Sequence, residues 1–247
     1  MRNIWTIAKK EFSQYFISPI AYSVAFLLLG IVGILFTLTL VGLSSNPSAG
    51  SAPDSRGTAY GVAFLLMLFT PALTMRLVAD EVRMGTMELL LTAPLRDYEL
   101  IVGKWLGAFL FILVLIAITL IFPLLFNAMT ENGIDQKLLI SNYVGTILVA
   151  ASLLSMGIAI SAIFSNQIAA FFTTMALFIV LFWLIGPLES MLPGGGGEIF
   201  KYLSFSSQFS DNFIQGSVSP SGIVYFLSLT GLGLLVGSTA VEIRRWR

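Results

Sequence analysis

The chain has 247 residues, of which 57% are hydrophobic and only 11% are charged, and its formal net charge is zero. Globular proteins carry about twice that charged fraction, so this chain has too few charges to cover a water-exposed surface. It contains no cysteine and no histidine, which excludes disulfides, thiolate or imidazole catalysis, and metal sites built on those side chains. The balanced charge also gives no basic surface for nucleic acid.

Residues 1–18 predict an amphipathic helix that lies in the plane of a membrane surface, an elbow ahead of the first long apolar run. Its two faces are marked by the apolar Trp5, Phe12 and Phe16 and by the cationic Lys9 and Lys10. Glu11 is the one charged residue on the apolar side. Ser18 and Pro19 then end the helix. The alternative is a positively charged flank that only sets the orientation of the chain.

Six apolar runs follow, and each is close to or above the ~20 residues that a helix needs to cross a bilayer. They are residues 20–43, 58–78, 100–126, 143–164, 168–188 and 223–241. The first run is too long for the core of a signal peptide, and we expect it to be retained. The sequence therefore predicts an all-α membrane protein with a single transmembrane domain.

The lysines and arginines predict the orientation of these spans, because positive charge is enriched on the cytoplasmic side. With the N-terminus in the cytoplasm, ten of the 13 basic residues fall inside, and only Arg56, Lys137 and Lys201 fall outside. An even number of spans then places both termini in the cytoplasm.

Two further segments have a readable role. Residues 189–220 contain a glycine run and then recurring phenylalanines, which favours one or two short helices at, or dipping into, the outer membrane face; the alternative is a surface loop. In the last span, Gly233 and Gly237 form a G-x-x-x-G pattern, which favours close helix packing.

The connection between the second and third spans, residues 79–99, is the one cytoplasmic segment dense in charge. Gly85 is a plausible end of the second span, since glycine favours helix C-termini. Thr86 then caps a short helix, Met87–Thr92, which Pro94 ends. Asp97 is expected to cap the third span.

That short helix carries leucines and methionines in a position exposed to water, which is costly unless they dock on another surface. Little other cytoplasmic chain is available to cover them, so a separate cytoplasmic protein is the expected partner. The residues expected to form the docking site are Glu81, Arg83, Gly85, Thr86, Met87, Glu88, Leu89, Leu90 and Pro94.

The stretches Pro71–Arg76 and Asp80–Pro94 resemble the signature region of ABC-2-type permeases, the membrane subunits of ATP-binding cassette transporters. They are most similar to the permeases of gliding motility and of nitrous-oxide-reductase maturation. Ile17–Tyr22, Lys201–Ser204, Phe209–Gly216 and Val224–Ser228 extend the resemblance over most of the chain.

The resemblance implies that residues 1–18 form the elbow helix and that residues 85–92 form the coupling helix, which rests in a groove of a separate ATPase. It implies two ATPase subunits and a second copy of this permease or a close paralogue, which the first and fifth spans would meet. It also implies a bacterial-type cytoplasmic membrane, contacts with membrane lipids, and room for an extracytoplasmic accessory subunit. ATP and Mg²⁺ would bind the ATPase, with no cofactor, metal or catalytic residue on this chain.

The motifs that the sequence lacks agree with the interpretation of the chain as a permease without its own ATPase. It has no G-x-x-x-x-G-K-[ST] phosphate-binding loop and no H-E-x-x-H zinc motif. The middles of the spans contain no charged residue, which weighs against an ion-coupled carrier. A permease moving a substrate is the first hypothesis, and a mechanical transmitter that moves an outer partner without transport is the second. A membrane-embedded enzyme is the third and least supported.

Overall fold

A computed structural model describes residues 2–45, 56–87, 95–129, 134–191 and 195–245. All regular structure within these ranges is helical. The helices are α1 (Arg2–Tyr15), α2 (Pro19–Ser45), α3 (Arg56–Thr74), α4 (Ala79–Arg83), α6 (Asp97–Thr119), α7 (Ile121–Met129), α8 (Gln136–Ile163), α9 (Gln167–Ile179), α10 (Ile185–Met191), α11 (Gly195–Leu203), α12 (Phe205–Phe209) and α13 (Pro220–Arg245). Two π-helical turns, η2 (Val180–Leu184) and η3 (Ser210–Ile214), follow α9 and α12.

The predicted set of six membrane spans is confirmed within the described residues. Six stretches are long and apolar enough to cross a bilayer: Pro19–Gly42, Arg56–Arg83, Asp97–Ala128, Gln136–Ile163, Gln167–Leu188 and Pro220–Arg245. The fourth begins earlier than the apolar run at Tyr143 predicted. Its first turn is set by Asp135, whose carboxylate accepts hydrogen bonds from the backbone N–H groups of Lys137 and Leu138.

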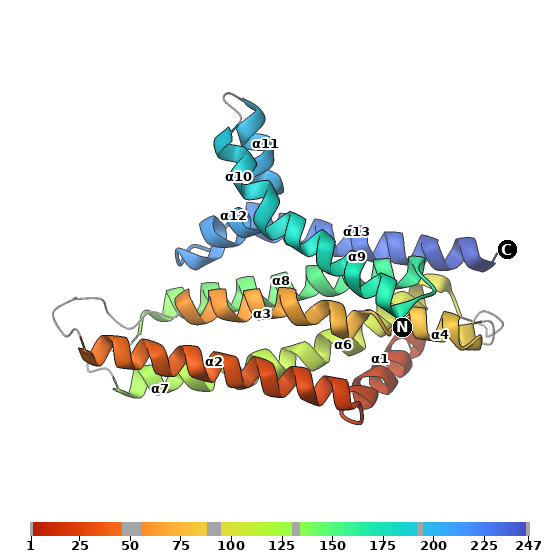
Figure 1. Cartoon of the computed structure of the whole chain (residues 1–247), viewed down its shortest axis with the longest axis horizontal. Coiled ribbons are helices and arrows are strands. Elements are labelled where there is room, and N and C mark those ends of the chain that lie inside the picture. Colours follow the sequence, from red (N-terminus) through yellow and green to blue (C-terminus); the bar gives the residue numbers. More distant parts are fainter. Residues whose placement is uncertain (1, 46–55, 88–94, 130–133, 192–194, 246–247) are drawn as a thin grey trace.

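Helix α8 is the centre of the bundle and packs against α3, α6, α9 and α13 (Figure 1). In its most apolar stretch 78% of the residues are buried, against 22% for the first span and 17% for the fifth. Glycines permit the closest contacts. A β-carbon at Gly233 would lie 2.6 Å from the carbonyl carbon of Ser155 in α8, and one at Gly237 would lie 3.2 Å from Cγ2 of Ile101 in α6 and 3.5 Å from the Cα of Ala159 in α8. The G-x-x-x-G pattern in α13 therefore faces α8.

The elbow segment forms α1, which packs directly on the start of α6. Two glycines of α6 make this possible. A β-carbon at Gly107 would lie 2.6 Å from the Cβ of Glu11 and 2.8 Å from the carbonyl oxygen of Ala8, and one at Gly103 would lie 2.8 Å from the Cβ of Ile7. The missing side chains let the backbones of α1 and α6 come close together, so that side chains of one helix reach those of the other.

The segment expected to hold short outer helices, residues 189–220, contains the end of α10, all of α11 and α12, and the turn η3. Helices α10 and α11 form a hairpin that extends away from the bundle (Figure 1). The chain then returns and lies on α8, where the Ser141 hydroxyl donates a 2.7 Å hydrogen bond to the carbonyl of Phe213. Phe205, Phe209 and Phe213 are buried in protein, so these recurring phenylalanines complete the core instead of facing lipid.

Candidate functional site

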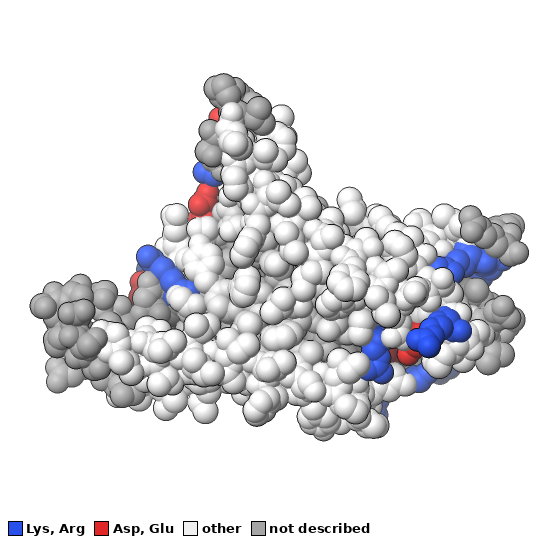
Figure 2. All heavy atoms as spheres, in the orientation of Figure 1, with Lys and Arg blue, Asp and Glu red and all other residues white. Residues whose placement is uncertain are grey.

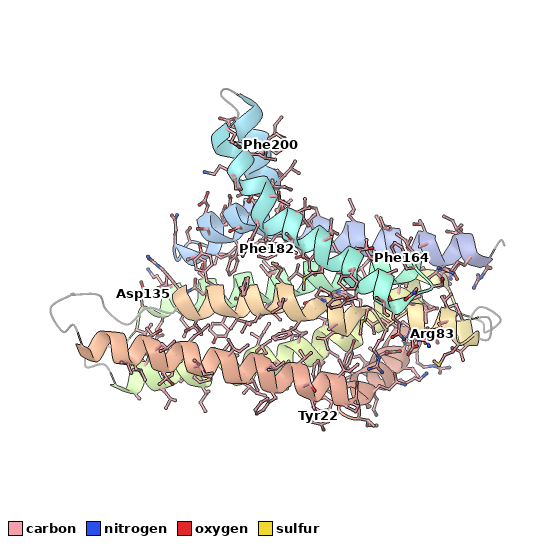
Figure 3. The ribbon with its side chains drawn as sticks, in the orientation of Figure 1. Tyr22, Arg83, Asp135, Phe164, Phe182 and Phe200 are labelled. Atoms are coloured by element: carbon pink, nitrogen blue, oxygen red, sulfur yellow. The ribbon has the colours of Figure 1, made fainter. Side chains whose placement is uncertain are left out.

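Charged side chains gather at the ends of the bundle. Lysines and arginines cluster at the end that carries both chain termini, here called the N/C end, while the middle of the visible face is uncharged (Figure 2). Arg83 and Phe164 lie at the N/C end, and Asp135 lies at the opposite end (Figure 3). Helix α4, which precedes the connection in which the sequence predicted a docking site, is at the N/C end (Figure 1).

A buried cluster of three charges joins three helices beside that connection. The Nζ atom of Lys104, in α6, lies 2.7 Å from Oε1 of Glu11 in α1 and 2.8 Å from Oε1 of Glu81 in α4. The Lys104 side chain is only 3% exposed, and those of Glu11 and Glu81 are 9% and 17% exposed. We call this group the Lys104 cluster.

The cluster depends on the close approach of α1 to α6. Because Gly103 and Gly107 flank Lys104 and lack side chains, α1 lies near enough for Glu11 to reach the ammonium group. A buried ammonium without partners would be strongly destabilising, and two carboxylates offset that cost. Nearby, burial and the charge of Glu11 raise the pKa of Tyr15 well above its usual range, so its hydroxyl stays protonated.

A second set of contacts holds the junction between α3 and α4. The α-helix is interrupted between Thr74 and Ala79. The Ser161 hydroxyl of α8 accepts from the N–H groups of Val78 and Ala79 and donates to the carbonyl of Met75, so it satisfies backbone groups that the interruption leaves free. The Gln167 amide at the start of α9 donates to the Asp80 carboxylate.

A third set of polar contacts fixes the start of α6. Arg96 is the N-cap, and its backbone N–H donates to Glu99, which also accepts from the amide of Asn3 in α1. Asp97 is therefore the first helical residue, and its predicted capping role is wrong. It pairs instead with Arg245 of α13 at 2.9 Å.

The predicted docking residues do not all face outward. Gly85 has φ +69°, the left-handed conformation that ends a helix, and Arg83 is exposed. Glu81 points inward to Lys104. One expectation needs correction: Met87 is 4% exposed instead of presented to a partner. Thr86 and Met87 are helical, and the Thr86 hydroxyl donates to the carbonyl of Glu81. The N–H groups that Thr86 was predicted to cap belong to residues outside the described ranges. Glu88, Leu89, Leu90 and Pro94 lie outside the described residues.

The predicted interfacial residues divide between water or lipid and the protein core. Trp5 and Phe16 are exposed, as are Lys9 and Lys10, while Phe12 is partly buried. Most of the apolar face of α1 contacts α6, with Ala8 and Tyr15 buried. This explains Glu11, which sits on the apolar side because that side faces Lys104.

A cavity of about 700 Å³ opens beside the cluster, between α1, the start of α2 and the α3–α4 region. Its lining combines charged and apolar side chains. The charged ones are Lys10, Glu11, Arg76, Asp80, Glu81 and Lys104.

Lys104 is the candidate functional residue that the sequence did not predict. It was counted only as one of the positive charges on the cytoplasmic side. Two signals could have identified it: Glu11 was the single charge on the apolar face of an amphipathic helix, and Lys104 stood between two glycines spaced for helix packing. Together they pointed to a buried ion pair.

The family model of the ABC-2 family transporter proteins matches residues 5–241, nearly the whole chain. The chain belongs to this family. It is thus a multi-pass membrane protein and a permease subunit of an ABC transporter, a type of subunit that works with an ATPase subunit. A search of curated proteins finds no match.

The cluster makes a prediction about stability. Lys104→Met should lower the free energy of unfolding by about 3–5 kcal/mol, because it leaves Glu11 and Glu81 buried without their counter-ion. Unfolding of the purified permease in detergent measures the change. Lys9→Met, on the exposed face of α1, is the matched control and should change stability by no more than about 0.5 kcal/mol.

A triple variant separates charge from packing. Lys104→Met combined with Glu11→Gln and Glu81→Gln should regain most of the lost stability, since no buried charge is then left unpaired. A triple variant no more stable than Lys104→Met alone would contradict this account of the cluster.

Proposed function

We propose that this permease moves a substrate across the cytoplasmic membrane, driven by ATP that a separate ATPase subunit binds with Mg²⁺ and hydrolyses. The observation that supports this most is the Lys104 cluster, which ties the helix before the docking connection to two other helices. The similarity of Arg76–Pro94 to the gliding-motility and nitrous-oxide-reductase maturation permeases supports placing the chain in that subfamily.

In the proposed mechanism, the ATPase pushes on the connection between α4 and α6. Since Glu81 bonds to Lys104, a displacement of α4 pulls α6 and α1 with it. The Asp80–Gln167 bond extends the link to α9, and Ser161 extends it to α8. Separating a buried ion pair costs several kcal/mol, so these helices are expected to move as one body.

The charges at the N/C end also indicate how the permease is oriented in the membrane. The N/C end carries both termini and most of the basic residues, which supports placing it in the cytoplasm. The docking connection then faces the ATPase, and the α10–α11 hairpin faces the outer side. Its exposed apolar residues, Met191, Ile199 and Tyr202, offer a surface to an accessory subunit or to a second permease.

We further propose that two permeases assemble with two ATPases. The first and fifth spans are the least buried, and α2 and α9 present large apolar side chains to their surroundings, including Phe26 and Phe172. These are the helices that the family resemblance places between two copies. The second copy is either identical or a close paralogue.

The interior of one bundle offers little to a substrate. Most of its buried hydroxyls donate to carbonyls of their own helices, as Thr74 does to Thr70, Thr146 to Asn142 and Thr230 to Phe226. A substrate path is therefore more plausible between two copies than through one. The same observation favours the alternative function, in which the permease relays ATPase motion to an extracytoplasmic partner and nothing crosses.

The docking segment can be tested by substitution. Glu88→Arg and Leu90→Asp should abolish most of the ATP hydrolysis that depends on the permease, because both place an unfavourable charge in the proposed contact with the ATPase. Hydrolysis by the reconstituted complex and co-purification of the ATPase are the measurements. Glu242→Arg is the matched control, since Glu242 is exposed at the same end of the bundle on α13.

Both docking variants should unfold like the unmodified permease. If either variant still co-purified with the ATPase and kept full stimulated hydrolysis, this segment would not be the docking site.

The proposed dimer can be tested by crosslinking, because the chain has no native cysteine. Phe26 in α2 and Phe172 in α9 are 78% and 64% exposed, and both lie near the N/C end of their helices. Each is replaced by cysteine. The doubly substituted permease should form a covalent dimer in membranes on oxidation. Leu38→Cys with Phe172→Cys, at different depths, should crosslink far less. Equal yields, or none with the first pair, would contradict this interface.

A further inference from the structure

The cavity between α1, α2 and the α3–α4 region is lined by charged groups whose hydrogen-bonding capacity the coupling contacts leave partly unused. Its volume of about 700 Å³ falls in the range of pockets that hold small ligands. Besides the Lys104 cluster, the lining carries polar side chains that include those of Lys10, Ser18, Arg76 and Asp80. Charges of both signs around one cavity constrain the ligand that would fit.

One side of the cavity is suited to an anion. The Arg76 guanidinium is partly buried and donates a 3.2 Å hydrogen bond to the hydroxyl of Ser18. Among the described residues, no carboxylate lies within ion-pair distance of Arg76 or Lys10. A guanidinium and an ammonium with free donors are the groups that proteins use to hold a phosphate.

The other side is suited to a cation. Oε2 of Glu81 is buried and has no hydrogen-bond partner in the described part of the chain, since Lys104 contacts only Oε1. Asp80 also lines the cavity and receives its side-chain hydrogen bond from the neutral amide of Gln167. A primary ammonium has three N–H donors, so it could satisfy the free carboxylate oxygen.

The remaining wall of the cavity is apolar and continues onto the exposed surface of the protein. Ile17, Ile20, Leu73 and Leu77 line the cavity, and the Ile17 side chain is 79% exposed. This corner joins the amphipathic α1 to the first span. In a bilayer such a corner lies where headgroups meet acyl chains. An apolar wall at that depth suits hydrocarbon chains.

We propose that this cavity binds one aminophospholipid of the phosphatidylethanolamine type. Its phosphate lies against Arg76 and Lys10, its ammonium lies against Glu81 and Asp80, and its acyl chains leave past Ile17 and Ile20. The bound lipid would fill the space between the elbow helix and α4. This site goes beyond the proposed function, because it requires neither a transported substrate nor an ATPase.

The test is lipid binding by the purified full-length permease in detergent, measured by native mass spectrometry during titration. Phosphatidylethanolamine should bind at least about tenfold more tightly than phosphatidylglycerol, which has no cation, or phosphatidylcholine, whose quaternary ammonium has no N–H. Glycerophosphoethanolamine, the headgroup without acyl chains, should compete only weakly.

Substitutions then locate the site. Arg76→Gln and Lys10→Gln should each weaken phosphatidylethanolamine binding by about tenfold, while Arg76→Lys, which keeps the charge, should retain most of it. Arg83→Gln and Lys9→Gln are the matched controls, because both residues are exposed neighbours outside the cavity lining. Lys10 is itself exposed, so its substitution should not affect folding.

Three results would overturn the proposal. They are equal affinity for the three lipids, equal affinity for the lipid and its soluble headgroup, or equal losses in the site variants and their controls. If Arg76→Gln kept lipid binding and instead lost the ATPase, the cavity would belong to the ATPase interface and the lipid site would be wrong.

Discussion

A buried lysine must have counter-charges, and in this permease that requirement organises the N/C end. Lys104 satisfies it with one carboxylate from α1 and one from α4. Neither partner is a neighbour in sequence, so the elbow helix, the helix before the docking connection and the third span are held in one arrangement. The glycines on either side of Lys104 serve the same requirement, since they let α1 approach α6 closely enough for Glu11 to reach Lys104.

The other polar contacts at this end extend the arrangement to the rest of the bundle. Ser161 and Gln167 hold the α3–α4 junction from α8 and α9, and Arg245 holds the start of α6 from α13. In contrast, the bundle interior is bound mainly by apolar packing and small residues. Hydrogen bonds and ion pairs between helices are concentrated at the end where the ATPase is proposed to act. This gives a physical reason why a displacement at that end would be passed on to the other helices.

The sequence predicted the number of spans and their approximate limits because crossing a bilayer demands long apolar runs, a constraint visible in one dimension. It also predicted the end of the second span, because Gly85 is suited to the left-handed backbone found there. It did not predict that Glu81 faces inward or that Met87 is buried, because both depend on which face of a segment meets the bundle. Glu11 looked like an irregularity until its partner was located.

In the proposed mechanism, the Lys104 cluster transmits motion and does not only stabilise the fold. The most direct measurement is ATP hydrolysis by the complex reconstituted with the charge-free permease, in which Lys104 is Met and both glutamates are Gln. The account predicts that this folded permease binds the ATPase but loses most of the permease-dependent hydrolysis. Full stimulation by that variant would contradict it and reduce the cluster to a structural role.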